Sequence, residues 1–591
     1  MYLNTKSSVF GRLFFSALVF ISTVFYLAHG ISNYFTGSGI TDAVIFHLKY
    51  GLRGAGFLEY WELIAVTVLI IISILFLYWV FLEKLKTKTE RKIYYIYPAF
   101  LFLFLSLFSN PASSELQDVL LRVYIANQLK ENKPNVTDFY KYYKKPYIKQ
   151  VGDSKNLVVI YAEGLERTYF DENLFPGLIK RLRELQSKST YFTNIKQVTG
   201  TEWTIGGMVA GQCGLPLFIS ADGNSMSGID KFLSSAVCLG DLLHKEDYYL
   251  VYYGGANLSF AGKGKFYSTH KFDEIYGKKE LVPKLENKSY KSGWGLFDDS
   301  LFDLVYQRFL KLSETRDKFA LFLLSLDTHY PKGNPSRDCQ NIIYKDGSNP
   351  ILNAVACSDY LITELANKIM KSPYGSETII VIVSDHLALR NDVTSLLNKK
   401  SRNNLLMILE PGADKSTEIE KLGSTIDLGT TIMPFIGYEG VVGLGRNLID
   451  KDLSELEIRH IHESLLAWQP SISLFWSFPK IQDYIEIDIT SETMEIDGRI
   501  FDIPVLIKLN TELETNLAFF LNLDKYVLDL EKNTPFLLID RCARAGRLDK
   551  KLRQSGFCLI AGQGSKYYKS IELENNLRLI VKDIKQYTGL K

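Results

Sequence analysis

The sequence lacks any strong excess of one charge. Its 68 lysines and arginines nearly balance 66 aspartates and glutamates, which leaves a formal net charge of +2 over 591 residues. The basic residues form no recognisable nucleic-acid reader, and the chain has no internal repeat or low-complexity tract. Nothing here indicates nucleic-acid binding or a repeat architecture. The length is sufficient for two or more domains, each with a full core.

Three stretches lack lysine, arginine, aspartate and glutamate altogether: residues 13–29, 63–82 and 93–109. Each is close to the ~20 residues that cross a bilayer as a helix. The first could instead be a cleaved signal peptide, but no small-residue cleavage site follows it and two more apolar stretches come after. We therefore expect a transmembrane region over residues 1–110 with three helices, the first acting as a signal anchor.

The short loop "EKLKTKTERK" predicts the orientation of these helices. It carries five basic residues between the second and third stretches, and Lys6 and Arg12 precede the first. Basic loops stay on the cytoplasmic side. Three crossings then place everything after residue 110 outside the cytoplasm.

Cysteine is absent from the first 212 residues. All six cysteines follow the third apolar stretch, where an oxidising compartment would allow disulfides. Free core cysteines are the alternative, but an even number confined to the exported part favours a disulfide framework. Nearest-neighbour pairing closes short loops within domains, and it predicts Cys213–Cys238, Cys339–Cys357 and Cys542–Cys558.

Residues 111–150 are polar and include "FYKYYKKPYIK", in which tyrosine and lysine alternate. We expect a linker here. It would lie against lipid headgroups, with rings at the interface and ammonium groups on phosphates, or it would be an ordinary solvated linker.

From residue 156 the pattern becomes that of a folded enzyme domain. Short apolar runs such as "LVVIYAE", "FALFLLSLD" and "TIIVIVSDH" alternate with amphipathic stretches such as "FPGLIKRLRELQSK". This alternation predicts a doubly wound α/β domain with a mostly parallel sheet over residues 151–455. Residues 456–591 show β-type alternation with turn signals and predict a smaller α+β domain.

Three of the apolar runs end in residues that can do chemistry. "NLVVIYAEGLER" ends at Glu163, "LFLLSLDTHYP" at Asp327 and His329, and "IIVIVSDH" at Asp385 and His386. Each alone is explained by helix capping or packing. Because ligands of an open α/β sheet bind at the carboxyl ends of its strands, the set together predicts a metal site.

A candidate nucleophile lies in "QVTGTEWTIGGMVAGQCGLPL". Thr204 stands just before an expected helix from Ile205, where the helix dipole and free N–H groups favour a negatively charged oxygen. An ordinary N-cap is the alternative. Thr199 and Thr201 are the neighbouring hydroxyls.

Five motifs occur in the same order as in a known family: "YAEGLERTYFD", "TGTEWTIGGMVAGQCGLPLF", "YYGGANLSFAGKGKFYSTHKFDEIYG", "SLDTHYPKG" and "VSDH". The chain resembles the bacterial phosphoglycerol transferase I family. That family belongs to the alkaline phosphatase and sulfatase superfamily, with lipoteichoic acid synthases and phosphoethanolamine transferases. The resemblance runs from the first apolar stretch to about residue 450, including "STIDLGTTIMPFIG". It implies a sulfatase-like α/β/α catalytic domain.

The resemblance also implies roles for individual residues. Glu163, Asp385 and His386 would bind one divalent cation, with Thr204 as fourth ligand and nucleophile. His329 would meet the phosphate and the leaving oxygen. Lys263 would contact the phosphate, and Asp327 is counted with these two as substrate-binding. The implied cation is manganese, with magnesium or zinc as alternatives.

Two departures from the wider superfamily are visible. Lipoteichoic acid synthases place an acid and a tryptophan just before the basic residue, where this chain has Asn257 and Phe260. Sulfatases carry a cysteine or serine in a Cys/Ser-x-Pro-x-Arg context, which is absent at Thr204. A sulfatase is therefore disfavoured.

The resemblance implies a multi-pass enzyme of the bacterial inner membrane whose catalytic domain faces the periplasm. It would move sn-glycerol 1-phosphate from phosphatidylglycerol to periplasmic, membrane-derived glucans or another glycan through a covalent threonine intermediate, releasing diacylglycerol. A phosphoethanolamine transferase acting on a periplasmic glycan or lipid A is the first alternative. A non-catalytic anchored binding domain is the second.

Overall fold

The computed structural model describes residues 20–34, 39–40, 44–45, 60–87, 109–117, 137–218, 232–476, 478–496, 499–518, 523–528, 530–552 and 555–590. The chain forms two compact units. The first comprises residues 1–232 and 237–473, and the second comprises residues 233–236 and 474–591.

The N-terminal part contains helices within two of the three predicted apolar stretches. Residues 20–34 are helical, and α3 spans Trp61–Thr87. Residues 13–19 and 93–108 lie outside the described residues. Among the helices that the structure describes, none combines the length and hydropathy needed to cross a bilayer. The three spans stay a prediction.

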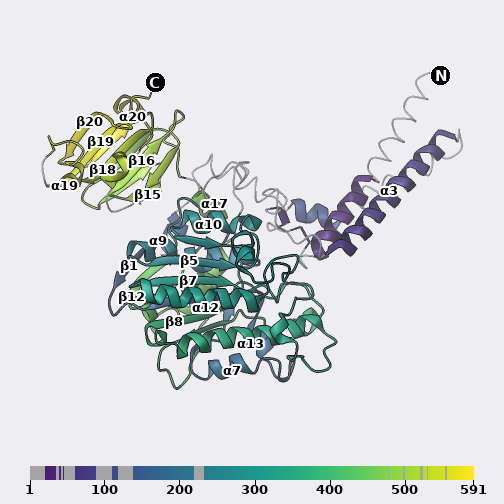
Figure 1. Cartoon of the computed structure of the whole chain (residues 1–591). Helices are drawn as coiled ribbons and strands as arrows, with labels where there is room; N and C mark the ends of the chain where they lie inside the picture. Colours follow the sequence, from purple (N-terminus) through teal and green to yellow (C-terminus); the bar gives the residue numbers. More distant parts are fainter. Residues whose placement is uncertain are drawn as a thin grey trace, which may run out of the picture. The chain divides into compact units, whose positions relative to one another are not determined.

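An eight-stranded sheet forms the centre of the first unit (Figure 1). Its strand order is β10 (Thr417–Ile419), β3 (Thr190–Phe192), β9 (Leu406–Leu409), β8 (Thr378–Ser384), β2 (Asn156–Ala162), β7 (Phe319–Leu324), β5 (Tyr249–Gly254) and β6 (Glu274–Tyr276). The neighbouring strands from β8 to β6 are parallel, and β9 runs antiparallel to β8 and β3. This is the predicted mostly parallel sheet.

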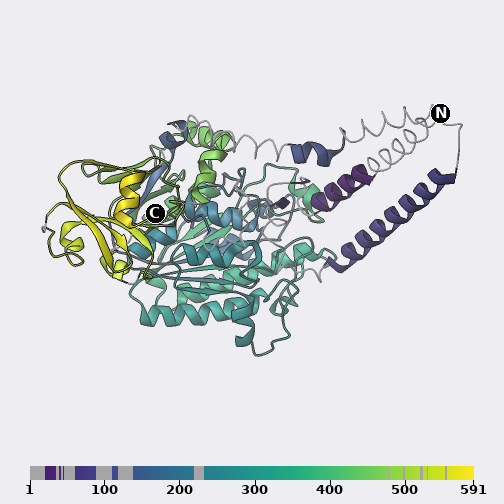
Figure 2. The same ribbon diagram turned by 90° about the horizontal axis from the view of Figure 1, so that it is seen from above.

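The central strands are apolar throughout because helices cover both faces of the sheet. Val158, Ile160 and Ala162 of β2 share one core with α12 (Asp298–Thr315) and α13 (Pro350–Lys371). Tyr161 points to the other face, where its hydroxyl approaches Gly211 of α8 (Thr204–Cys213). Figures 1 and 2 show the long helices α12 and α13 alongside this sheet. Burial on both faces explains the absence of polar alternation in these strands.

Other short elements surround the sheet of the first unit. They include α7 (Arg181–Gln186), α9 (Leu239–Lys245), α10 (Lys263–Thr269), α11 (Lys278–Leu281), α14 (Thr394–Leu397), α15 (Leu428–Ile432), α16 (Glu455–Ser464) and α17 (Gln469–Ser473). A small pair joins β4 (Ile195–Lys196) to β11 (Gly423–Ser424). Because α16 and α17 belong to the first unit, that unit ends at Ser473, whereas the sequence placed the boundary after residue 455.

The expected linker over residues 111–150 needs correction at its C-terminal end. Residues Thr137–Tyr142 form α6, and Lys144–Gln150 form β1, which pairs antiparallel with β12 (Tyr438–Gly443). Arg446 also donates a hydrogen bond to the carbonyl of Tyr142 at 2.8 Å. These residues are part of the first unit. In β1 only Ile148 is buried, and the lysines and Tyr147 are exposed, as is usual for an edge strand.

The second unit contains two antiparallel sheets with short helices. Four strands are ordered β15 (Arg499–Asp502), β14 (Thr493–Ile496), β13 (Tyr484–Asp488) and β21 (Leu577–Ile580). Five are ordered β17 (Thr515–Ala518), β16 (Val505–Leu509), β18 (Pro535–Arg541), β19 (Phe557–Gln563) and β20 (Lys566–Leu573). The helices are α18 (Leu523–Leu528), α19 (Cys542–Ala545) and α20 (Val581–Thr588). A core of isoleucines and leucines from both sheets holds the unit together.

All three predicted disulfides are confirmed. Cys213–Cys238 joins the end of α8 to the residue before α9, and Cys339–Cys357 ties the loop after β7 to α13. Cys542–Cys558 joins α19 to β19 within the second unit. The bonded cysteines are 16 to 25 residues apart, and both members of each pair belong to the same compact unit.

Candidate active site

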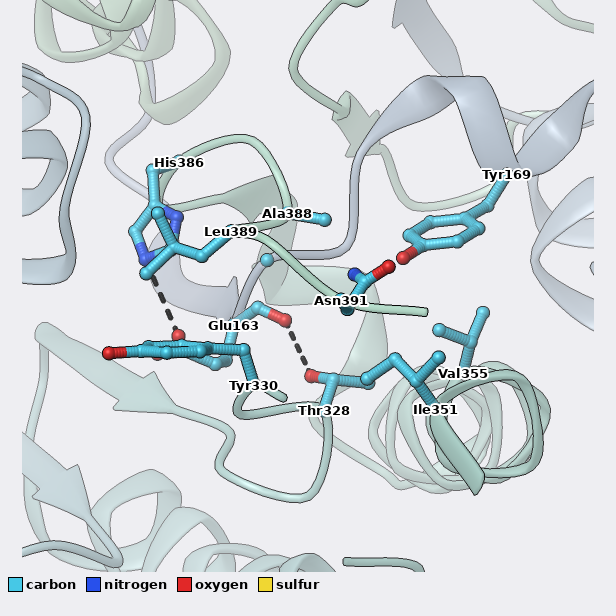
Figure 3. A pocket seen from close by; sticks show the side chains of 11 residues that line it. Glu163, Tyr169, Thr328, Tyr330, Ile351, Val355, His386, Ala388, Leu389 and Asn391 are labelled. Atoms are coloured by element: carbon cyan, nitrogen blue, oxygen red, sulfur yellow. Dashed lines mark hydrogen bonds and ion pairs between the residues drawn. The ribbon is translucent and has the colours of Figure 1, made fainter. Parts of the chain in front are cut away.

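Two adjacent parallel strands bring Glu163, Asp385 and His386 together. Ala162 at the end of β2 pairs with Ser384 at the end of β8, so the residues that follow both strands leave the sheet at the same edge. One ligand atom from each of the three side chains lies within 4.8 Å of the others, and all three side chains are buried. Figure 3 shows Glu163 and His386 facing one another.

Thr204 joins this cluster as the first residue of α8. Its hydroxyl lies 3.3 Å from Glu163 Oε2 and 3.4 Å from His386 Nε2. The N-cap position belongs to Trp203, so the hydroxyl of Thr204 faces the cluster instead of capping its own helix. Thr201 differs, because its hydroxyl closes a turn by donating to the carbonyl of Val198 at 2.7 Å and accepting from its N–H.

A close backbone contact sets the position of α8. Gly207 packs so tightly on the end of β8 that a Cβ there would lie 1.7 Å from the carbonyl oxygen of Asp385. Only glycine permits this approach. The N-terminus of α8, where the helix dipole favours negative charge, is thereby held at the strand edge that carries the acidic residues.

The donor set fits a divalent cation. Asp385 Oδ1 accepts hydrogen bonds of 2.9 Å from the N–H groups of Gly164 and His386, while its buried Oδ2 accepts none within the described part of the chain. His386 donates from Nδ1 to the carbonyl of Leu387 at 2.7 Å, so Nε2 is the nitrogen that faces the two carboxylates. This nitrogen lies 3.2 Å from Asp385 Oδ2 and 3.4 Å from Glu163 Oε1. Catalytic metal sites typically combine buried carboxylate and imidazole ligands and leave one coordination position for water or substrate.

The electrostatics of the cluster lead to the same interpretation. Burial and the charge of Glu163 raise the pKa of Asp385. Burial also opposes ionisation of Glu163, but the hydrogen bond and charge of His386 outweigh it and lower the pKa of Glu163. Burial lowers the pKa of His386, yet the two carboxylates raise it to about 9. Two carboxylates this close repel one another, and a bound cation would relieve that repulsion.

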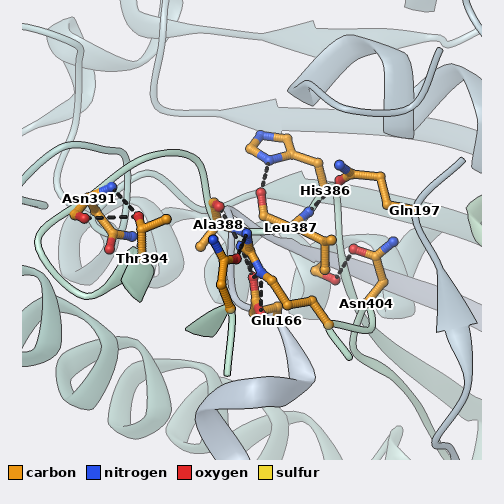
Figure 4. Close-up of polar contacts among 12 residues, drawn as sticks. Glu166, Gln197, His386, Leu387, Ala388, Asn391, Thr394 and Asn404 are labelled. Carbon is orange, nitrogen blue, oxygen red and sulfur yellow. Dashed lines mark hydrogen bonds and ion pairs between the residues drawn. The ribbon is translucent and has the colours of Figure 1, made fainter. Parts of the chain in front are cut away.

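A second layer fixes the loop after β8 (Figure 4). Glu166 is fully buried and accepts a 3.0 Å hydrogen bond from the N–H of Ala388. Arg402 pairs with Glu166 through Nε at 3.0 Å and donates to the carbonyl of Ala388 at 2.6 Å. Gln197 accepts the N–H of Leu387 at 2.8 Å. The sequence did not single out these three side chains, because partners 236 residues apart leave no local signal.

His329 and Lys263 lie beside the cluster. His329 donates from Nδ1 to the carbonyl of Tyr330 at 3.0 Å, and its charge contributes to lowering the pKa of Glu163. Lys263 begins α10 and is only 3% exposed, with its Nζ 4.9 Å from the ring centre of Phe260. Burial lowers the pKa of Lys263 to about 8, against the opposing charges of Glu163 and Asp385. The sequence predicts that His329 and Lys263 contact the substrate, and this stays a prediction.

Asp327 has a different setting. Its Oδ1 accepts the N–H of Asp298 at 3.1 Å, and its Oδ2 accepts the N–H of Ser336 at 2.9 Å. Asp298 in turn accepts the N–H groups of Leu326 and Asp327. Asp327 therefore connects the loop after β7, which also carries His329, to the start of α12.

A pocket opens beside Glu163 and His386, and Figure 3 shows its lining. Tyr330 lies near the two polar residues, and at the other end the hydroxyl of Tyr169 points toward Asn391. Apolar side chains complete the wall: Ile351, Val355, Ala388 and Leu389. The cluster thus borders a cavity that both polar and apolar side chains line.

Family models match most of this chain. Residues 1–130 match the N-terminal domain of phosphoglycerol transferase I, residues 155–438 match the sulfatase family, and residues 483–589 match the middle domain of phosphoglycerol transferase I. The first unit therefore has the sulfatase-like fold expected from the sequence.

Curated relatives agree with these models. The chain is 35% identical over 523 residues to a phosphoglycerol transferase I from Escherichia fergusonii. The aligned region covers 88% of this chain and 67% of the relative. The chain is also 35% identical over 543 residues to one from Escherichia coli O6:K15:H31, covering 90% and 70%. A solved alkaline phosphatase superfamily protein from Vibrio parahaemolyticus shares 19% identity, with a TM-score of 0.44 and coverage of 65% of this chain and 86% of that one.

Proposed function

The chain belongs to the phosphoglycerol transferase I family, and from that membership we propose that it moves a glycerol phosphate group from phosphatidylglycerol to a glycan through Thr204. The enzyme is a phosphotransferase. The observation that carries the threonine mechanism is the convergence of the Thr204 hydroxyl with Glu163 and His386 at 3.3 and 3.4 Å.

In the first step, Thr204 Oγ1 attacks the phosphorus of phosphatidylglycerol. A bond forms between that oxygen and phosphorus, and the bond from phosphorus to the diacylglycerol oxygen breaks. The proton of Thr204 leaves to solvent, and His329 donates one to the diacylglycerol oxygen. The start of α8 favours the negatively charged threonine oxygen through its dipole and free N–H groups. Glycerol phosphate then remains esterified to Thr204.

Glu163, Asp385, His386 and Thr204 would hold one divalent cation. When bound, such an ion lowers the pKa of a coordinated hydroxyl and offsets charge on phosphoryl oxygens. Lys263 adds a further positive charge next to the same oxygens. The cation is proposed to be manganese, with magnesium and zinc as alternatives.

In the second step, a sugar hydroxyl of the acceptor attacks the phosphorus. The new bond replaces the one to Thr204. His329, left neutral by the first step, takes the proton of the sugar hydroxyl, and the oxygen of Thr204 leaves and regains a proton from solvent. Covalent catalysis thus divides the transfer into two in-line displacements. We propose a periplasmic glucan as the acceptor.

We also propose that the three apolar stretches anchor the enzyme in the bacterial inner membrane with residues 111–591 in the periplasm. Three disulfides beyond residue 210 and the match of residues 1–130 to the family's N-terminal domain support this topology. A reporter active only in the periplasm, fused after residue 150, should be active. An inactive reporter in a correctly inserted fusion would show that the residues after 150 face the cytoplasm.

The experiment that tests the donor uses purified protein with headgroup-labelled phosphatidylglycerol or phosphatidylethanolamine, a glucan acceptor and added manganese. We expect loss of phosphatidylglycerol, release of diacylglycerol and label on the glucan. Consumption of phosphatidylethanolamine instead would identify a phosphoethanolamine transferase. Thr204→Ala should be inactive, while Thr201→Ala serves as the matched control at a neighbouring hydroxyl.

A further inference from the structure

An aromatic cluster lies against His329. Trp294 is its centre, with its ring 4.2 Å from the ring of His329, 5.3 Å from Phe260 and 6.2 Å from Tyr60, measured between ring centres. Lys263 faces the ring of Phe260. The cluster therefore lies next to His329 and Lys263, which are expected to contact the phosphate and the leaving oxygen.

The loop that carries Trp294 is held firmly in place. Gly295 forms a β-bridge with Ala256, and a Cβ at Gly295 would lie 2.0 Å from the carbonyl oxygen of Gly255. On the other side of Trp294, Lys278 donates to the carbonyl of Gly293 at 2.8 Å. This loop is thus fixed to the segment that leads into α10 and Lys263. A ring fixed in this way can orient a bound molecule.

Trp294 carries a hydrogen-bond donor for which the described residues offer no acceptor. Its side chain is buried, and Nε1 has no hydrogen-bond partner within the described part of the chain. An indole N–H can only donate, and buried donors without a partner are rare in folded proteins. The position of this donor beside His329 suits an oxygen of a bound substrate.

The N-terminal segment completes the cluster. Tyr60 precedes α3, is 8% exposed and donates from its hydroxyl to the carbonyl of Tyr330 at 3.3 Å. It packs with Trp294, Ala256 and Leu326 in one small hydrophobic core. The part of the chain expected to enter the membrane thus contacts the loop that bears His329.

We propose that Trp294, Phe260 and Tyr60 form the subsite for the glycerol headgroup of the donor, with the Trp294 N–H donating to a glycerol hydroxyl. This assignment rests on the proposed use of phosphatidylglycerol. The ammonium of Lys263 makes the subsite positive, so it disfavours the cationic headgroup of phosphatidylethanolamine and accepts a neutral diol.

The test compares two donors of equal charge: phosphatidylglycerol and phosphatidylpropanol, whose headgroup has no hydroxyl. Trp294→Phe keeps an aromatic ring and removes the N–H. Loss of one neutral hydrogen bond reduces kcat/KM by about threefold to tenfold. We expect this loss with phosphatidylglycerol and no change with phosphatidylpropanol. Trp468→Phe is the matched control, since the Nε1 of Trp468 already donates to Asp138 at 3.3 Å.

An equal loss with both donors would mean that Trp294 only supports the fold, and it would overturn the subsite. No loss with either donor would overturn it as well. Failure of the wild-type enzyme to consume phosphatidylglycerol is a separate result, which would reject the proposed function itself.

Discussion

Lys263 is a buried ammonium group whose protonation should govern the alkaline limit of activity. Burial lowers its pKa to about 8, although Glu163 and Asp385 oppose this shift. The group is charged below that pH and neutral above it, so phosphate binding should weaken as pH rises. We predict that kcat/KM falls above pH about 8.

Lys263→Arg separates this effect from other titrations. Arginine stays protonated across the accessible range, so the variant should retain its kcat/KM to higher pH even if its absolute rate is lower. The measurement is a pH profile of kcat/KM for both proteins. An alkaline limit at the same pH in the arginine variant would assign the titration to another group.

We infer that Glu166 positions the loop that carries the proposed metal ligands Asp385 and His386. The Glu166 carboxylate accepts the N–H of Ala388, two residues beyond His386, and pairs with Arg402. Mutation of a residue that hydrogen-bonds a metal ligand or its loop commonly lowers metal affinity by ~10- to 100-fold. We predict a loss of that size in manganese affinity for Glu166→Gln, measured by titration calorimetry.

The control for this variant is Glu457→Gln, which removes a carboxylate from another ion pair, with Arg446 at 2.7 Å. Thermal melting establishes that both variants are folded at the assay temperature. Unchanged manganese affinity in folded Glu166→Gln would show that the loop after β8 holds its position without this carboxylate.

At the scale of elements, the site depends on how closely α8 approaches the ends of β2 and β8. Gly207 allows this contact, and a methyl group there would require a shift of more than an ångström because its Cβ would lie 1.7 Å from a backbone oxygen. Misplacement of reacting groups by about 1 Å can cost ~100-fold in rate. We predict that Gly207→Ala lowers the transfer rate by about that factor.

Gly211→Ala is the matched control on the same helix. Its nearest contact would be Leu428 Cδ2 at 2.8 Å, the end of a side chain that can move. Activity should remain near that of the wild type. Equal activity of the two alanine variants would contradict the role assigned to the contact between α8 and Asp385.

The strands could be predicted because burial on both faces leaves uninterrupted apolar runs, as in β2, β7 and β8. The residues that follow them, such as Glu163 and Asp385, could be placed at one edge by the same reasoning. β1 was missed because its lysines and tyrosines lack the apolar character of the central strands. Its pairing with β12 joins residues far apart in the chain, which a single sequence does not reveal.

At the scale of the whole molecule, the chain combines a sulfatase-like unit with a smaller β-rich unit. The cluster of Glu163, Thr204, Asp385 and His386 could be assembled from motif order. The second layer and the aromatic cluster could not, because Arg402 and Trp294 act through contacts that only the folded chain creates. The sequence thus predicted which side chains cluster better than it predicted the residues around them.

The central claim is that Thr204 carries the transferred group. The most direct test is brief reaction of the purified enzyme with labelled phosphatidylglycerol and manganese, without acceptor, followed by digestion and mass spectrometry. We predict glycerol phosphate on Thr204 in the wild-type protein, no adduct in Thr204→Ala, and loss of the adduct when glucan is added. An adduct on another hydroxyl such as Thr201, or transfer by Thr204→Ala at near the wild-type rate, would contradict this mechanism.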